Sequence, residues 1–511
     1  MRTSTMRRLF AASSLVGALL VGGCGTFDIT NPNQPTLDDL VTNPTRAKLS
    51  AAATGLFISS RGTSIAIGTH AGIQDLIWRL GSMGREGARL DGNNQPDYQE
   101  PYFGPLSGTG FGRAVWDTRY QHIRSVNTYL TAVPKVVGKP APDGITQGEA
   151  DASIGFAKTL KALAFMYIVE THAALGAPVD VDQDVSAAPA PFVSEDSVYG
   201  YILGLLNDAQ DHLNAAAGAT FPFLLPPGYS SFNLPATFLQ FNRALAAKAY
   251  LLRATAASSS CGLSACYNAA LTALGASFVD LTAANLQNGV YYDFSTGAND
   301  ATNDLSEPLN GTSFFALPEL DTLSQSQNGV PVASGGTPDQ RFLDKVGAAT
   351  GPLQILAAIP IPGTRKFVNY FTNGNADPNH SIPVIKNEEL ILLRAEANIG
   401  LNQLGAALSD INFIRQNSGK LPPLAGFASQ QAAITELLYN RRYSLLWEQG
   451  TSWIDARRYN RFDLIPIPPG FANGPNPQSN IGPSVVPNRL LIPDTECSAR
   501  GLPTGCSPLG T

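Results

Sequence analysis

The chain has 511 residues, of which 44% are hydrophobic and only 14% are charged. A typical globular protein has about 25% charged residues, and here glycine, asparagine, serine, threonine and proline take their place. This composition predicts an extracytoplasmic globular protein with a large core and long ordered loops. The formal net charge of −6 argues against nucleic acid as a partner, because binding to phosphates requires a basic surface.

Residues 1–23 have the pattern of a secretory signal: a basic start followed by an apolar run too short to cross a bilayer. The run ends in Val-Gly-Gly before Cys24, which predicts cleavage by a lipoprotein signal peptidase and acylation of Cys24. The alternative is an ordinary signal peptide that ends near a cysteine by chance. Several acyl chains anchor stably, since each buried CH₂ contributes about 0.8 kcal/mol. Residues 24–45 are expected to form a polar tether. No later run is expected to be long and apolar enough to span a membrane.

The other four cysteines form two close pairs. Cys261 and Cys266 are five residues apart, and Cys497 and Cys506 are nine apart. Close pairs in a secreted chain predict local disulfides. The alternatives are free thiols or a metal site, but no histidine accompanies either pair.

Helical periodicity is frequent between the tether and the middle of the chain. Apolar residues recur at helical spacing, and serine, glycine and proline mark the ends of these segments. A helix that begins near Trp116 places the indole on its apolar face, which predicts a structural core residue. The recurring helix pairs predict a mainly α fold and indicate a degenerate tetratricopeptide-like (TPR-like) array, although the repeat does not meet the strict consensus. The other helical segments are residues 46–60, 148–175, 194–215, 235–256 and 267–275.

Three segments lack long apolar periodicity. Residues 81–112 are expected to form a long loop, and loops of this length are usually functional or disordered. Asparagine, glycine, serine, threonine and proline dominate residues 277–380, where short strands are expected at 290–294 and 313–317. From Phe462 onward the chain is rich in proline and is expected to be a helix-free tail wrapped on the core.

Residues 382–458 predict three further helices. The first, at about 387–399, is apolar on most sides and should be sandwiched between neighbours. The second carries an apolar stripe from Leu404 to Ile414, and Gly400 falls in the short joint before it. The two helices are therefore expected to form an antiparallel hairpin.

The third helix of this stretch is expected to begin near Ser429, which is a good N-cap. It places Arg441 on an apolar face, where a guanidinium needs a partner. Glu448, two turns further on, is the expected structural partner.

The same stretch resembles the SusD/RagB family, because four motifs occur in that family's order. They read I-P-V-I followed by E-L-I-L-L-R-A-E-A, then A-L-S-D-I-N-F-I-R, R-R-Y-S-L-L-W-E and W-I-D-A-R-R-Y. The chain departs from the family at Asn440, where an acidic residue is frequent, and in the run 448–453. The resemblance supports the TPR-like array. It implies a lipid-anchored protein of a Gram-negative outer membrane that faces the cell exterior. Such proteins bind nutrients, for example oligosaccharides, beside a SusC-like TonB-dependent transporter.

The resulting organisation has three parts after the tether. Residues 46–275 are expected to form an N-terminal SusD-like part with helical repeats and a loop insertion. Residues 276–381 are expected to form a loop-rich, ligand-binding part. Residues 382–511 are expected to form the C-terminal SusD/RagB helical part with its proline-rich tail.

Ligand binding is expected in the loops, since the resemblance places the site outside the repeat array. Aromatic rings stack on sugar faces, and polar side chains bond the hydroxyl groups at their edges. The alternative for each aromatic residue is packing inside the loops, where most large aromatic side chains are buried. The candidate ligand-binding residues are Asp91, Asn93, Tyr98, Tyr102, Phe103, Tyr291, Tyr292 and Phe315.

Motifs for catalysis are not found. The chain contains no metalloprotease His-Glu-x-x-His, no Gly-x-Ser-x-Gly and no phosphate-binding loop, and its five histidines lack metal-ligand spacing. We therefore expect no enzyme activity, no cofactor and no metal. A glycoside hydrolase, whose paired carboxylates meet only on folding, and a protein-binding scaffold remain the alternatives, and a peptide is the alternative ligand.

Overall fold

The computed structural model describes residues 37–62, 72–90, 95–184, 186–297, 300–351, 363–467 and 485–510. The signal segment 1–23, the acylation site Cys24 and most of the tether lie outside these ranges and stay predictions. The tether is shorter than expected, because α2 (Leu37–Thr42) already forms before residue 46.

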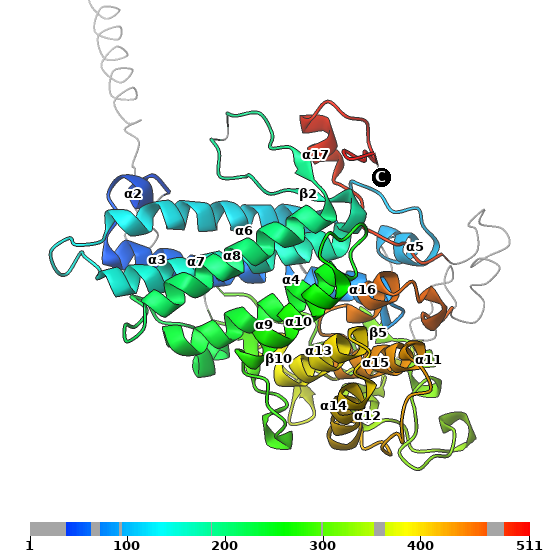
Figure 1. Ribbon diagram of the computed structural model, residues 1–511. Coiled ribbons are helices and arrows are strands. Elements are labelled where there is room, and N and C mark those ends of the chain that lie inside the picture. Colours follow the sequence, from blue (N-terminus) through cyan, green and yellow to red (C-terminus); the bar gives the residue numbers. More distant parts are fainter. Residues whose placement is uncertain are drawn as a thin grey trace, which may run out of the picture.

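Helices make up most of the described chain, which confirms the mainly α fold (Figure 1). The α-helices are α3 (Arg46–Arg61), α4 (Ile73–Met83), α5 (Gln95–Phe103), α6 (Arg113–Ala132), α7 (Gln147–His172), α8 (Glu195–Ala215), α9 (Pro235–Ala254), α10 (Leu263–Gly275), α11 (Glu319–Thr322), α12 (Gln340–Lys345), α13 (Asn387–Gly400), α14 (Leu404–Asn417), α15 (Gln430–Ser444), α16 (Thr451–Arg458) and α17 (Asp494–Ala499). The 3₁₀ helices are η1 (Val133–Lys135), η2 (Ala173–Leu175), η3 (Pro227–Phe232), η4 (Ala283–Asn285), η5 (Val332–Ser334) and η6 (Phe462–Leu464).

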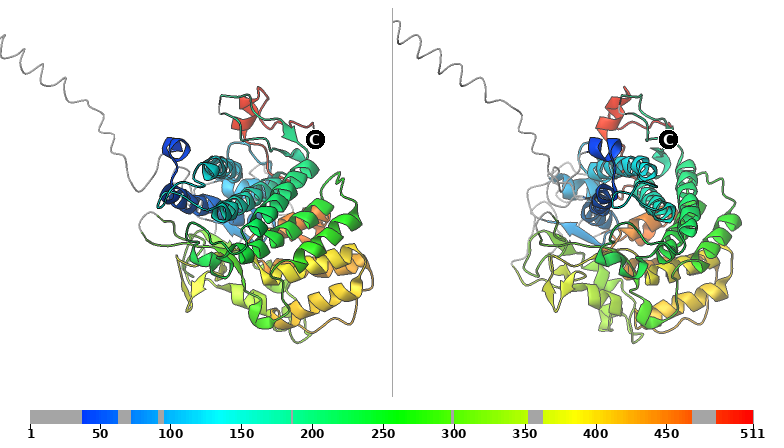
Figure 2. Two further views of the ribbon diagram at one scale, coloured as in Figure 1. Left: turned by 60° about the vertical axis from the view of Figure 1, so that its left-hand side comes forward. Right: turned by 90° about the vertical axis from the view of Figure 1, so that its left-hand side faces the viewer.

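The long helices form one continuous stack. In chain order, α3 packs on α6, α6 on α7, α7 on α8, α8 on α9 and α9 on α10. The stack then continues through α13 to α14 and α15, and the views in Figures 1 and 2 show it curving around the side of the molecule. The expected TPR-like array of helix pairs is therefore confirmed.

Helix α13 is enclosed as its apolar sequence predicts, with contacts to α9, α10, α14 and α15. Gly400 has a different role from the expected one, since it is the last residue of α13 rather than part of the joint. A Cβ atom at Gly400 would lie 2.3 Å from the ring of Tyr267 on α10. The glycine thus permits close packing of α10 on α13.

One expectation about membrane spans is wrong. The helical segment Gln147–Leu175 is long and apolar enough to cross a membrane by length and composition. However, 89% of its most apolar window is buried inside the protein, between α6 and α8. Its apolar character is explained by its place at the centre of the stack.

The strands are short and form small antiparallel sheets. The largest has the order β1-β5-β7-β6, and β4 pairs with β10. Strands β4 and β5 coincide with the two that the sequence predicts. The strands are β1 (Gly87–Arg89), β2 (Ala177–Pro178), β3 (Phe192–Val193), β4 (Gly289–Tyr292), β5 (Phe314–Ala316), β6 (Val346–Ala348), β7 (Arg365–Phe367), β8 (Phe371–Thr372), β9 (Asn375–Ala376) and β10 (Ile382–Lys386).

Three expectations about loops and helices are wrong. The expected loop 81–112 contains β1 and α5, the C-terminal stretch has a fourth helix, α16, and the tail contains α17. The tail nevertheless wraps on the core as predicted, with Leu490 and Ile492 fully buried. Each missed helix is short, so its position depends on contacts with distant segments rather than on a long apolar repeat.

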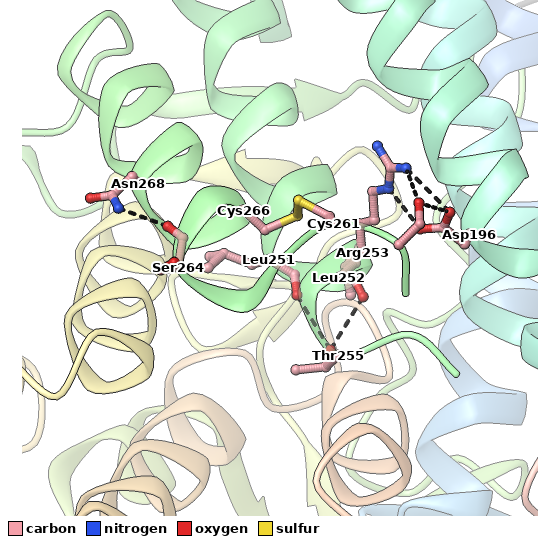
Figure 3. The surroundings of a disulfide bond; sticks show 10 residues. Asp196, Leu251, Leu252, Arg253, Thr255, Cys261, Ser264, Cys266 and Asn268 are labelled. Carbon is pink, nitrogen blue, oxygen red and sulfur yellow. Dashed lines mark hydrogen bonds and ion pairs between the residues drawn. A yellow bond between two sulfur atoms is a disulfide. The ribbon is translucent and has the colours of Figure 1, made fainter. Parts of the chain in front are cut away.

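Both close cysteine pairs are disulfide-bonded, with Cα–Cα distances of 5.8 Å. The bond between Cys261 and Cys266 closes the connection from α9 to α10 (Figure 3). Beside it, Arg253 Nε donates to Asp196 Oδ1 at 2.8 Å and joins α9 to α8. Ser260 in the same connection donates to Asp196 Oδ2 at 2.6 Å. This disulfide therefore lies where three neighbouring helices of the stack meet.

Arg441 is buried and paired, but Glu448 is not its partner. Arg441 Nε donates to Asp455 Oδ2 at 2.6 Å, and its Nη1 lies 3.9 Å from Glu396 Oε2. Helix α15 ends at Ser444, so Glu448 does not share its face. Glu448 instead pairs with Lys345 and Lys386 at 2.7 and 2.8 Å. Both residues are structural, as expected, but they belong to two different ion-pair groups.

We predict that Asp455→Asn lowers the free energy of unfolding by about 3–5 kcal/mol, because it leaves Arg441 and Arg458 buried with less counter-charge. Chemical denaturation followed by circular dichroism measures this. The control is Asp463→Asn at the exposed pair with Arg461, where the expected loss is below about 1 kcal/mol. Equal losses in the two variants would contradict a special role for the buried group.

Candidate functional site

The candidate site is a cavity of about 280 Å³ formed by three segments that are far apart in the sequence. They are the last two turns of α3, the chain that leads into η3, and β4 with the residues after it. The wall combines aromatic rings, aliphatic side chains and a few charged groups. The residues that line it are Thr54, Phe57, Ile58, Ser60, Arg61, Leu224, Leu225, Pro226, Tyr229, Tyr291, Tyr292, Asp293 and Asp300.

The aromatic part of the wall comes from β4 and η3. Pairing of β4 with β10 sets Tyr292 opposite Ile382 and Tyr291 opposite Pro383. Successive side chains of a strand point to opposite faces, and here Tyr292 is buried whereas Tyr291 is half-buried. Tyr229 lies beneath, with its ring centroid 5.1 Å from that of Phe57. Tyr291 is therefore the more exposed of the two β4 tyrosines that line the cavity.

Arg61 supplies the charge at the base of the cavity. It is the last residue of α3, and Gly62 ends the helix in the left-handed conformation. The guanidinium is 5% exposed, lies over the ring of Phe294, forms an ion pair with Asp300 and donates to the carbonyl of Asp293. These contacts hold a fixed, largely neutralised cation against the wall.

Two polar atoms at the cavity are buried without a hydrogen-bond partner among the described residues. They are the hydroxyl oxygen of Tyr229 and Nε of Arg61. Burial raises the pKa of Tyr229 well above its usual value, and Tyr292 and Asp293 act in the same direction, so the hydroxyl stays protonated. An unpaired buried polar atom costs about 1–3 kcal/mol, so the wall of the cavity carries a cost at these two positions.

The two carboxylates of the cavity are both engaged by protein groups. Asp293 accepts hydrogen bonds from Gly228 N at 2.7 Å and from the Ser381 hydroxyl at 3.1 Å. Asp300 is held by Arg61. Within the described part of the chain, no cluster of histidine, cysteine or acidic residues has the arrangement of a metal site. This geometry is suited to holding a neutral polar ligand.

Comparison with protein-family profiles finds no match, and no curated protein matches the chain in sequence. Solved structures do match. A SusD-like carbohydrate-binding protein from Bacteroides fragilis superposes with a TM-score of 0.66 at 16% identity, covering 89% of this chain and 98% of its own. A SusD superfamily protein from Bacteroides vulgatus gives a TM-score of 0.64 at 13% identity, with coverage of 90% and 99%. A laminarin-binding SusD-like protein gives 0.56 at 16% identity, again with coverage of 90% and 99%.

The chain has the SusD-like fold. The match extends over nearly the whole length of each of these structures, so it includes the helical stack and the loop-rich part together. The fold that the four C-terminal motifs imply is thereby confirmed.

Within this SusD-like fold, none of the first-half ligand candidates whose side chains are described lines the cavity. Asp91 and Asn93 lie outside the described residues, as does the side chain of Tyr98 on α5. Tyr102 and Phe103 are buried, and the Tyr102 hydroxyl donates to the carbonyl of Gly87 at 2.8 Å. For Tyr102 and Phe103, packing inside the protein is therefore the correct interpretation.

The candidates of the second half divide between the core and the cavity. Phe315 on β5 is buried in the same small cluster as Tyr102 and Phe103, so it also packs internally. Tyr292 is 3% exposed and forms part of the cavity wall. Tyr291 is the candidate that a ligand can reach.

Sequence reasoning missed most of the residues around the cavity. Leu224 is 91% exposed and Ile58 is 38% exposed at its rim, and Arg61 and Tyr229 form its base. The run Leu-Leu-Pro-Pro at 224–227 was an available signal, since two leucines in a proline-rich turn are unusual in the absence of a core position. Arg61 had no such signal, because it stands at the end of an ordinary amphipathic helix.

The histidines of the core are structural. His122 Nδ1 lies 2.7 Å from the Ser59 hydroxyl, and the ring of His172 packs against Trp116 at 4.8 Å between centroids. Trp116 is 3% exposed, in agreement with its expected place in the core. Burial, assisted by Arg119, lowers the pKa of His122 to about 3, and burial lowers that of His172 to about 4.

These low pKa values predict acid sensitivity. The folded state binds fewer protons than the unfolded state, so the contribution of His122 is complete above about pH 6.5 and is lost as the pH falls toward about 3. Between pH 7 and pH 5 it amounts to about 2 kcal/mol. We expect the difference in unfolding free energy between wild type and His122→Asn, measured by urea denaturation, to shrink by this amount. If the unfolding free energies of wild type and variant changed with pH in parallel, His122 would not change its protonation on unfolding.

Proposed function

We propose that the protein is a member of the SusD/RagB family that acts as a nutrient-binding lipoprotein. It would capture a solute, foremost an oligosaccharide, in the cavity beside Tyr291 and deliver it to a SusC-like TonB-dependent transporter. Its location would be the outer membrane of a Gram-negative bacterium, on the side facing the cell exterior, with the acyl chains of Cys24 as anchor. The SusD-like fold, the four C-terminal motifs and the lipoprotein-type leader support this proposal.

The composition of the cavity is the observation that supports a sugar as the ligand. It combines the half-buried Tyr291 and aliphatic side chains with the polar groups of Arg61 and Asp293. A sugar matches this pattern, since its apolar face stacks on an aromatic ring and its hydroxyl groups bond polar atoms. A volume of about 280 Å³ suits one end or one branch of an oligosaccharide rather than a long chain.

A glycoside hydrolase is the second candidate, because Asp293 and Asp300 line the same cavity. Hydrolysis requires one carboxyl group free to donate a proton and one free to attack or to activate water. Here both carboxylates are held by protein partners. Incubation of the purified protein with a panel of oligosaccharides separates the two functions: saturable binding without products supports the receptor, and turnover supports the enzyme.

We predict that Tyr291→Ala weakens oligosaccharide binding about 5- to 10-fold, which corresponds to the loss of one aromatic stacking contact. Tyr291→Phe is the matched control. It keeps the ring and removes only the hydroxyl, which donates to the carbonyl of Gln287 rather than into the cavity. Isothermal titration of both variants with the best ligand from a glycan array measures the effect. Unchanged binding by Tyr291→Ala would place the ligand elsewhere and would leave a peptide ligand or a protein-binding scaffold to be tested.

Anchoring is tested separately. We expect Cys24→Ala to release the protein from the membrane fraction, because the acyl chains would supply the attachment. Detergent partitioning and mass spectrometry of the mature N-terminus measure this in a Gram-negative host. Equal membrane retention of the variant would contradict acylation at Cys24 and leave the ligand site unaffected.

A further inference from the structure

A second cavity, of about 250 Å³, lies between α15, α16 and the end of α11. Its walls are largely apolar, from the side chains of Leu323, Leu438, Ala456 and Leu464. Leu323 is 47% exposed and stands at its rim. No residue of this cavity lines the one beside Tyr291, so the two are distinct sites.

Arg442 of α15 lines this cavity, and it has no ion-pair partner among the described residues. One hydrogen bond holds it, from Nη2 to the carbonyl of Leu464 at 3.1 Å. Burial lowers the pKa of Arg442, while Tyr443 and Glu86 oppose this only in part. Glu86 forms no ion pair with it, since its carboxylate accepts from Trp447 N at 2.9 Å and from the Ser452 hydroxyl at 2.5 Å. The guanidinium therefore keeps most of its donors unused.

The other polar groups of the cavity are already engaged. Glu436 pairs with Arg415 at 2.5 Å, and Asp455 pairs with Arg441 and Arg458. The hydroxyl of Tyr439 donates to Asp339 Oδ2 at 2.8 Å. Each carboxylate here is balanced by its own arginine, so Arg442 carries the uncompensated charge of this wall.

Most arginines of the C-terminal part, unlike Arg442, form an ion pair with a carboxylate. Among the described arginines of this part, Arg394, Arg415, Arg441, Arg458, Arg461 and Arg500 have a carboxylate within 4 Å, whereas Arg457, like Arg442, bonds a backbone carbonyl instead. The segment 468–484, which follows η6, contains no aspartate or glutamate and offers no counter-ion by composition. Arg442 is half-buried, and a planar carboxylate matches the fork of guanidinium donors with two parallel hydrogen bonds.

We propose that this cavity binds a small organic acid with an apolar body. Its carboxylate pairs with Arg442, and its hydrocarbon part fills the space between Leu323, Leu438 and Ala456. A volume of about 250 Å³ admits a molecule of the size of benzoate or hexanoate. The protein would thus sense or carry an acid at a site independent of the proposed nutrient cavity.

The test uses benzoate and hexanoate as probes, with benzamide and hexanamide as uncharged counterparts of the same shape. Saturation-transfer NMR and isothermal titration with the full mature protein should show saturable binding of the acids. The amides should bind at least about tenfold more weakly, since they lack the charge that pairs with the guanidinium. Equal binding of acids and amides, or no binding of either, would overturn the proposal.

Two variants locate the bound acid. Arg442→Gln should weaken acid binding at least about tenfold, and Leu323→Trp should do the same by filling the entrance from an exposed position. Leu323→Trp keeps the test decisive if loss of Arg442 impairs folding. Arg461→Gln is the control, because Arg461 is a paired arginine near α16 that does not line the cavity.

The result is separable from the proposed nutrient function. Tyr291→Ala should leave acid binding unchanged, since it alters the other cavity. Inorganic phosphate that competes as well as benzoate would show a general anion site and overturn the role of the apolar wall. Acid binding unchanged in both Arg442→Gln and Leu323→Trp would likewise overturn the assignment to this cavity.

Discussion

The position of α13 depends on the neutralisation of its buried acidic residues. Glu388, Glu389 and Glu396 are each no more than 3% exposed on a helix that is mostly apolar. Buried carboxylates require partners, and removing one partner is more costly than the pair is stabilising. Glu389 meets Lys248 of α9 at 3.2 Å, and Glu396 pairs with Arg458 of α16. The charges thus fix α13 relative to elements from both halves of the chain.

The same requirement explains why the C-terminal motifs are rich in arginine and acidic residues. Hydrophobic burial alone would allow α13 to rotate or slide against its neighbours, since its apolar surface extends around most of the helix. Lys386 just before α13 adds a second constraint through Glu448 at 2.8 Å. Burial lowers the pKa of Lys386, but Glu448 and Glu388 outweigh it, so that the net shift is upward and the amine remains charged. Packing encloses α13, and the ion pairs select its orientation.

Sequence patterns predicted most of the long helices to within a few residues and missed α4 and the short helices. In α8, α9 and α13 the apolar repeat runs over several turns, so the local pattern and the tertiary packing agree. Helix α5 includes Pro101 and has no apolar face, so only its surroundings stabilise it. The expected ion pair between Arg441 and Glu448 does not form, because the backbone turns between the two residues. Trp447 adopts a φ of 57° after the end of α15, and stacking on Phe367 with centroids 4.0 Å apart holds it there.

The candidate site was predictable only in part, because its cavity joins segments more than 60 residues apart. The composition of 277–380 pointed to Tyr291, which lines the cavity, but strand alternation turns its neighbour Tyr292 inward. Pairing of β1 with β5 buries Phe315 opposite Ala88, which no local pattern reveals. In the first cavity, Arg61 is balanced by Asp300 and the wall is suited to a neutral ligand. In the second cavity, Arg442 has no such partner among the residues that the structure describes. The charge of the ligand that each cavity favours therefore depends on whether its arginine is paired with a carboxylate. Which arginines are paired is decided by the three-dimensional structure and cannot be derived from the local sequence.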